Sequence, residues 1–157
     1  MLIGETIVTS ISEILNKAAE RGRKMNLPYG GALLPQEAYE LMQKAPGARL
    51  VDVRTEAEWD YVGRIPGSVQ IEWQTYPGSK PNPNFLNELQ AQTDKQAVVM
   101  FLCRSGARSH AAAALAAQAG YSHSYNVLQG FEGDRDAGGH RNSVGGWRVA
   151  GLPWVQS

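Results

Sequence analysis

The fold is decided by residues 97–120, which read AVVMFLCRSGARSHAAAALAAQAG. Residues 97–102 are apolar without alternation, a pattern typical of a strand that is buried on both faces of a parallel sheet. Residues 109–119 are rich in alanine, the strongest helix former, and Gly120 stands where a helix C-cap glycine belongs. The stretch therefore predicts a buried strand, a short loop that begins at Cys103, and a helix.

Helices and strands alternate outward from this unit. We expect further helices at about residues 6–24, 35–44, 55–60 and 84–92, and short strands at about residues 49–53, 68–71 and 124–128. Pro35 suits the first position of its helix, and Thr55 with Glu58 predicts a capping box. Residues 73–83 carry Pro and Gly and predict a loop. The alternation indicates an α/β fold whose mostly parallel sheet is flanked by helices.

The amino-terminal helix has one apolar face. Its apolar residues recur at three- and four-residue steps, at Ile7, Ile11, Ile14, Leu15 and Ala18. We expect this face to pack on the helix's own domain rather than on a second copy of the chain.

Composition excludes several classes of function. The chain of 157 residues fits one domain, and its 15 basic and 15 acidic residues give no support to nucleic acid or an anionic membrane as partner. No apolar run is long enough to span a bilayer, and the amino end does not resemble a secretory signal, so a cytoplasmic location is expected. The single cysteine excludes an internal disulfide.

The sequence predicts neither a metal site nor a cofactor. His110, His123 and His140 share no metal-ligand spacing, and His110 is expected to be an exposed helix residue rather than a proton donor. A calcium loop that began at Asp134 would need a glutamate at its twelfth position, where Gly145 stands.

The chemistry is expected at Cys103, which follows the buried strand and precedes the helix. A short loop at that position turns backbone N–H groups inward, and Gly106 supplies the backbone freedom for the turn. The helix terminus, Arg104 and Arg108 add positive charge, which favours the thiolate over a thiol of ordinary pKa about 8.5. A buried structural cysteine is the alternative, but arginines and a glycine are not core composition.

Two reactions suit a thiolate in such a loop: hydrolysis of a phosphate ester and transfer of a sulfur atom. Cysteine phosphatases carry one residue more between the cysteine and the arginine than the four residues that separate Cys103 from Arg108. They also usually carry a histidine where Leu102 stands. The tighter loop fits a single added sulfur atom better than a phosphate group.

Four ordered motifs resemble those of single-domain rhodaneses. They are residues 103–109 (CRSGARS), residues 50–54 (LVDVR) followed by Glu58 and Trp59, residues 63–68 (GRIPGS), and residues 147–153 (WRVAGLP). The resemblance covers residues 31–157 and leaves residues 1–30 as an amino-terminal helical extension. It implies a rhodanese-like three-layer sandwich with a central five-stranded parallel sheet.

The resemblance also implies roles for individual residues. Cys103 would carry the sulfur, and its cradle would consist of Arg104, Ser105, Gly106, Ala107 and Arg108. Asp52, Arg54 and Ser109 would support this loop rather than act in catalysis.

Residues 132–145 form an insertion that separates Gly130-Phe131 from Gly146-Trp147, whereas the family normally has only a few residues between a glycine pair and the closing tryptophan. The insertion leaves the carboxyl end of strand 124–128, the same sheet edge from which Cys103 emerges, so we expect it to shape access to the thiol. Candidate residues of the active-site rim are Trp73, Arg135, His140, Arg141 and Trp147.

The leading hypothesis is a sulfurtransferase that moves sulfane sulfur from thiosulfate or a persulfide to a thiol or cyanide through a Cys103 persulfide. Its acceptor could be a small thiol, a sulfur-carrier protein or a thioredoxin-like protein. The alternatives are a sulfur carrier or binding module without turnover, and a cysteine-dependent phosphatase or arsenate reductase.

Overall fold

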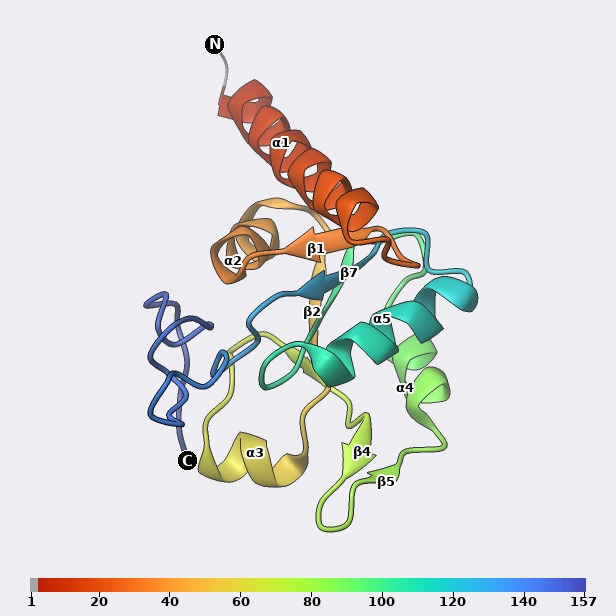
Figure 1. Ribbon diagram of the computed structural model, residues 1–157. Helices are drawn as coiled ribbons and strands as arrows, with labels where there is room; N and C mark the ends of the chain where they lie inside the picture. Colours follow the sequence, from red (N-terminus) through yellow and green to blue (C-terminus); the bar gives the residue numbers. More distant parts are fainter. Residues whose placement is uncertain (1–2) are drawn as a thin grey trace.

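The computed structural model describes the backbone of residues 3–157 and the side chains of residues 10–157. The helices are α1 (Ile3–Lys24), α2 (Pro35–Lys44), α3 (Glu56–Tyr61), α4 (Phe85–Gln92) and α5 (Ala107–Gln118). The main sheet is parallel and consists, in spatial order, of β1 (Gly31–Leu33), β7 (Ser124–Val127), β6 (Val99–Leu102), β2 (Arg49–Asp52) and β3 (Val69–Gln70). The predicted five-stranded α/β architecture is confirmed (Figure 1).

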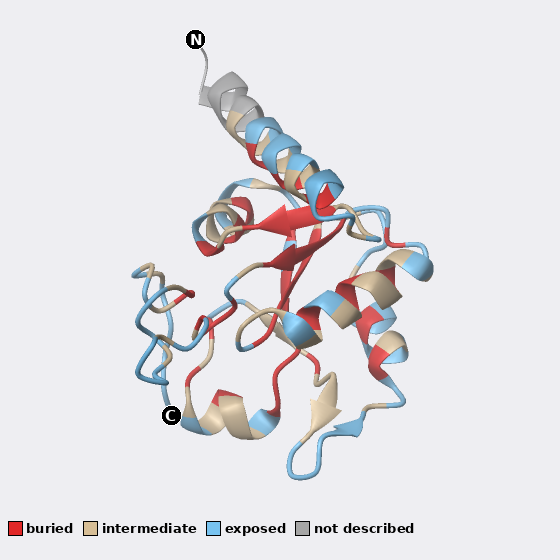
Figure 2. Cartoon of the chain, viewed as in Figure 1, coloured by how far each residue is buried: buried red, intermediate tan, exposed pale blue. Residues whose placement is uncertain are grey.

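Each face of the sheet packs against its own layer of helices. In the central strand β6, Met100 and Leu102 belong to a core shared with α1 and α2, whereas Val99 and Phe101 belong to a core shared with α4 and α5. All four residues of β6 are buried, and Figure 2 shows the central strands of the main sheet as its buried layer. An apolar run without alternation has this appearance because both faces of the strand are covered.

The first helix packs on its own domain, as expected. Ile14 and Ala18 are buried in the core, and Ile11 and Leu15 pack against it, while the side chain of Ile7 lies outside the described residues. The backbone of α1 meets β1 closely at Gly31, where a β-carbon would collide with the carbonyl of Ala18. Whether residue 30 is a domain boundary stays a prediction.

A bidentate ion pair adds to this attachment. Arg21 near the end of α1 binds Glu37 of α2 at 2.6 and 2.9 Å and donates to the backbone oxygen of Ala32.

Among the described residues, no helix has the length and hydropathy needed to cross a membrane.

Three local features differ from the expectation based on residue patterns. Strand β1 is too short to show a period of its own, and its pairing with β7 is set by the sheet. The expected loop at residues 73–83 contains an antiparallel hairpin of β4 (Gln74–Thr75) and β5 (Lys80–Pro81). Helix α5 begins at Ala107, two residues before the predicted start, because Gly106 ends the loop with φ +121°.

Candidate active site

The thiol of Cys103 lies at the carboxyl end of β6 and the amino end of α5. The backbone N–H of Gly106 donates to the Cys103 Sγ at 3.1 Å, and the side chain is only 2% exposed. The positive φ of Gly106 produces the curl that the sequence predicts for residues 103–108, called here the cysteine loop. An N–H donor and a helix amino terminus both favour negative charge on sulfur.

A buried polar chain supports the thiol from behind. The Ser109 hydroxyl lies 3.3 Å from the Cys103 Sγ and donates to the Asn126 Oδ1 at 2.6 Å. The Asn126 Nδ2 donates in turn to the Gly106 carbonyl at 3.2 Å. The sequence prediction missed Asn126, although a polar residue in the middle of a predicted strand, between Tyr125 and Val127, was a signal of such a role.

These polar contacts continue from Asn126 toward the surface through Tyr29. Its hydroxyl lies 2.7 Å from the His110 Nδ1, and burial raises the pKa of Tyr29 to about 12, which a hydrogen bond with Asn126 partly opposes. Tyr29 is therefore neutral at physiological pH. His110 is exposed, as expected.

No three His, Cys, Asp or Glu side chains within residues 10–157 come together as a metal site.

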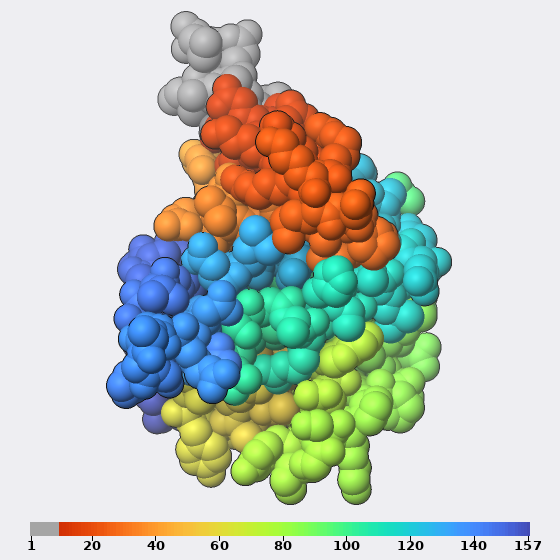
Figure 3. Space-filling model, in the orientation of Figure 1, coloured from red at the N-terminus to blue at the C-terminus, as the bar shows by residue number. Residues whose placement is uncertain are grey.

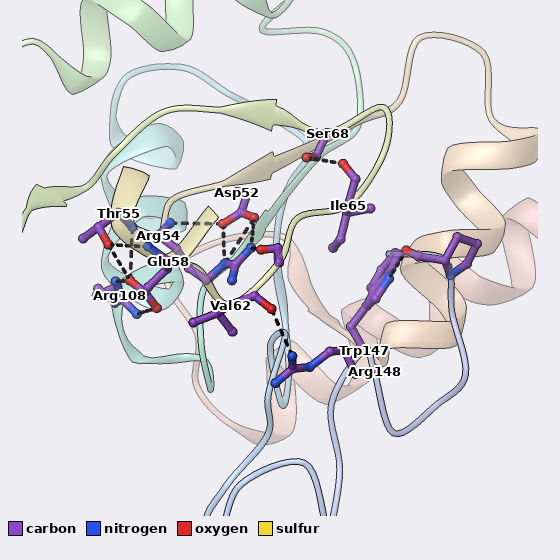
Figure 4. A network of polar contacts seen from close by, with 12 residues as sticks. Asp52, Arg54, Thr55, Glu58, Val62, Ile65, Ser68, Arg108, Trp147 and Arg148 are labelled. Atoms are coloured by element: carbon purple, nitrogen blue, oxygen red, sulfur yellow. Dashed lines mark hydrogen bonds and ion pairs between the residues drawn. The ribbon is translucent and has the colours of Figure 1, made fainter. Parts of the chain in front are cut away.

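Arg108 is paired with Glu58. Its guanidinium donates to both carboxylate oxygens at 2.7 and 3.0 Å, and each side chain of the pair is 18% exposed (Figure 4). Burial opposes ionisation of both partners, but the hydrogen bond and the charge attraction between them lower the pKa of Glu58 and raise the pKa of Arg108. The charge of Arg108 is thus balanced within the protein, and Arg104 is the exposed cation of the cysteine loop.

Glu58 has a second function that the sequence did predict. It accepts from the Thr55 N–H and hydroxyl at 3.1 Å each, while the Thr55 oxygen accepts from the Glu58 N–H, so the capping box of α3 is confirmed. One carboxylate therefore joins the start of α3 to the cysteine loop.

Asp52 and Arg54 form a second ion pair that is completely buried. Arg54 donates to both oxygens of Asp52 and, at 2.8 Å, to the Gly63 carbonyl. The guanidinium lies 4.1 Å from the centre of the Phe131 ring, and the Phe131 N–H donates to the Cys103 carbonyl at 2.8 Å. The pair thus contacts the cysteine loop through Phe131.

The insertion begins directly beside the cysteine loop. The N–H groups of Glu132 and Gly133 donate to the Arg104 carbonyl at 3.0 and 3.3 Å. Within the insertion, the Asp136 carboxylate accepts from the N–H groups of Gly138 and His140 and closes a turn. The stem of the insertion therefore lies near the thiol, as the shared sheet edge predicts.

Arg148 fixes the insertion to the rest of the domain. Its guanidinium donates to the Val62 carbonyl at 3.1 Å (Figure 4). It also donates to the Asn142 Oδ1 at 3.0 Å and lies 3.7 Å from Glu132. The side chain also stacks over the rings of Phe131 and Trp154.

A groove of about 680 Å³ opens beside the cysteine loop. Four segments line it: α3 with its cap, the β4–β5 hairpin, the cysteine loop and the insertion. The side chains that matter for its chemistry are Glu58, Tyr61, Tyr76, Arg104, Arg108, Glu132 and Arg141. Figure 3 shows these segments gathered on one face of the molecule.

The predicted rim residues have different positions. Arg141 lines the groove, whereas Arg135 and His140 are exposed elsewhere on the insertion and Trp73 packs edge-to-face on Phe85. The prediction for Trp147 is wrong.

Trp147 is completely buried, because its ring packs against Tyr39 of α2 within the hydrophobic core. Its indole N–H donates to the Pro153 carbonyl at 2.9 Å. An aromatic residue beside glycines suggested a loop position, but the closing segment folds back onto the sheet.

Comparison with known proteins places these features in a family. Residues 34–137 match the rhodanese-like domain. A protein from M. tuberculosis with a solved crystal structure is 47% identical in sequence to this chain, and the two structures superpose with a TM-score of 0.75. The match covers 82% of this chain and 99% of the M. tuberculosis chain. An uncharacterized protein of Rickettsia rickettsii is 38% identical over 75% of this chain and 91% of its own length. A thiosulfate sulfurtransferase of Actinobacillus succinogenes is 30% identical over 77% of this chain and 86% of its own length.

Proposed function

The chain belongs to the rhodanese-like domain family, and we propose that it is a sulfurtransferase that accepts sulfur from thiosulfate or a persulfide on Cys103 and passes it to a thiol or cyanide. The observation that carries the proposal is the Gly106 N–H directed at the Cys103 Sγ at the amino end of α5. The similarity to a thiosulfate sulfurtransferase supports the choice of reaction.

The first half of the reaction loads the cysteine. The Cys103 thiolate attacks the outer sulfur of thiosulfate, and the sulfur–sulfur bond of thiosulfate breaks. Its electron pair leaves with sulfite, and Cys103 becomes a persulfide. The Gly106 N–H and the helix terminus stabilise the negative charge before and after this transfer.

The second half returns the cysteine to its starting state. An acceptor thiolate attacks the outer sulfur of the persulfide, and the Cys103 sulfur–sulfur bond breaks. The electron pair returns to the Cys103 Sγ as thiolate, and the acceptor leaves as a persulfide. The atom that the acceptor attacks is the outer sulfur of the persulfide, since the Cys103 side chain itself is only 2% exposed.

Cys103→Ser is expected to abolish sulfur transfer from thiosulfate to cyanide without loss of the fold, since Cys103 is the only thiol in the chain. Intact mass after incubation with thiosulfate should show one added sulfur atom in the parent protein and none in the variant. Transfer activity retained by the variant would contradict the mechanism.

The same two measurements separate the other functions. A sulfur carrier without turnover gains the added mass but does not discharge it to cyanide. A phosphatase gains no sulfur and hydrolyses an aryl phosphate instead. The proposal requires both sulfur loading and discharge, with thiosulfate turned over much faster than the phosphate.

A further inference from the structure

Asn126 places a carboxamide in the buried middle of β7. Asparagine is disfavoured in strands, and a buried amide costs free energy unless its polar atoms are hydrogen-bonded. The Asn126 Oδ1 accepts from the Ser109 hydroxyl at 2.6 Å, and the Nδ2 donates to the Gly106 carbonyl at 3.2 Å. Asn126 is also hydrogen-bonded to the Tyr29 hydroxyl. Both ends of the amide therefore have partners, and two of these partners adjoin the thiol.

The Gly106 carbonyl fixes the orientation of this amide. A carbonyl oxygen can only accept a hydrogen bond, so the Asn126 Nδ2 must face Gly106 and the Oδ1 must face Ser109. The Oδ1 can likewise only accept, so the single hydroxyl hydrogen of Ser109 is directed at Asn126. Ser109 is left with lone pairs for its other neighbour.

That neighbour is the thiol, and Ser109 is an acceptor toward it. The Ser109 Oγ and the Cys103 Sγ are 3.3 Å apart, and either atom could donate at this distance. Because Asn126 occupies the hydroxyl hydrogen, the S–H of Cys103 is the donor. This hydrogen bond stabilises the protonated thiol, whereas the Gly106 N–H at 3.1 Å from Sγ stabilises the thiolate. The two contacts of the sulfur therefore oppose one another.

We propose that Asn126 is a positioning residue that restrains the reactivity of Cys103, because it holds the Ser109 hydroxyl in the orientation that favours the protonated thiol. To donate to the thiolate, this hydroxyl must turn toward Sγ and leave the buried Asn126 Oδ1 without a donor, which costs free energy. The proposal rests on the sulfurtransferase function, since it names a residue that sets how readily Cys103 attacks the sulfur donor.

The charged and titratable side chains around the cysteine loop come from several elements. They are the Glu58–Arg108 and Asp52–Arg54 pairs, Arg104, His110, Tyr29 and Glu132. A test that leaves all of them unchanged assigns any difference in pH dependence to the hydrogen bonds of Asn126.

The test measures alkylation of Cys103, the only thiol, by iodoacetamide across a range of pH. In Asn126→Leu, which keeps a similar volume and removes both polar groups, the freed Ser109 hydroxyl can donate to the thiolate. The pH at which the rate is half-maximal should therefore fall by about 0.5–1 unit, the effect of one hydrogen bond. Asn126→Ala should shift it in the same direction if the leucine does not fit in β7. Asn126→Asp keeps an oxygen that accepts from Ser109, so its midpoint should equal or exceed that of the parent.

The Ser109→Ala background makes the result specific. Asn126 acts through the Ser109 hydroxyl, so Asn126→Leu should cause no further shift when that hydroxyl is absent. An equal fall in this background, or in Asn126→Asp, would assign the effect to loosened packing and overturn the proposal. An unchanged or raised midpoint in the leucine and alanine variants would overturn it as well. Alkylation involves no sulfur transfer, so failure of the parent protein to gain sulfur from thiosulfate or polysulfide would instead refute the function on which the proposal rests.

Discussion

Two of the arginine–carboxylate pairs near the cysteine loop, Asp52–Arg54 and Glu58–Arg108, differ in their access to water. The Asp52–Arg54 pair has no exposed surface, whereas each side chain of the Glu58–Arg108 pair is 18% exposed and lines the groove. The buried pair is surrounded by the Gly63 carbonyl and the Phe131 ring, so nothing from solvent can compete for it. An anion in the groove can compete for Arg108. The contrast suggests that the buried pair maintains the fold and the exposed pair adjusts the charge at the site.

The largest effect is expected from breaking the buried pair on one side. Asp52→Ala leaves Arg54 as an uncompensated buried charge, which should lower the free energy of unfolding by about 3–5 kcal/mol. Urea denaturation measures this loss. The double variant Asp52→Leu with Arg54→Met should recover part of it, because no buried charge remains. A single variant as stable as the parent would show that water reaches this pair.

A smaller loss is expected from Glu58→Gln, since the pair is partly exposed and glutamine can still cap α3. We expect about 1 kcal/mol at pH 7. The pKa of Glu58 in the folded protein lies below its ordinary value of 4.5, so the contribution of the pair is present above pH 4.5 and is lost as the pH falls through the folded pKa. The stabilities of parent and variant should therefore converge on acidification. A gap that persists in acid would assign the loss to capping instead of charge.

The smallest effect is expected on thiosulfate transfer in Arg108→Gln. The charge of Arg108 is already balanced by Glu58, and the Gly106 N–H and Arg104 remain, so kcat/KM should fall only a few-fold. Glu58→Gln should raise kcat/KM for thiosulfate by a similar factor at low salt, because it leaves Arg108 unpaired. Equal losses in both variants would show that the pair positions the loop and that its charge has no separate effect.

The residue patterns identified the central elements correctly because their signals are local. Residues 97–102 are apolar on both faces, and residues 109–119 are helical by composition, so the strand, the loop and the helix needed no information from elsewhere in the chain. The capping box of Thr55 and Glu58 lies within one turn and was predicted for the same reason. Strand β1 has only three residues and became visible only through its pairing with β7.

Contacts between distant segments explain what the patterns missed. Trp147 was expected at the rim and lies in the core, because the closing segment packs against Tyr39 of α2. Asn126 lies in β7, yet its amide connects Ser109 to the Gly106 carbonyl. No periodic pattern of residues predicts either contact, since each depends on how separate helices and strands are placed relative to one another.

The sequence by itself determined the α/β layers, the position of Cys103 between a buried strand and a helix, and the glycine that turns the loop, because hydrophobic periodicity and backbone freedom are properties of neighbouring residues. Only the tertiary structure decided which arginines keep an unpaired charge. Arg104 and Arg108 look equivalent in the sequence, but α3 brings Glu58 to Arg108, and the insertion brings Arg141 to the groove that Arg104 lines. An electrostatic site depends on distances between charges, and the packing of separate segments sets those distances.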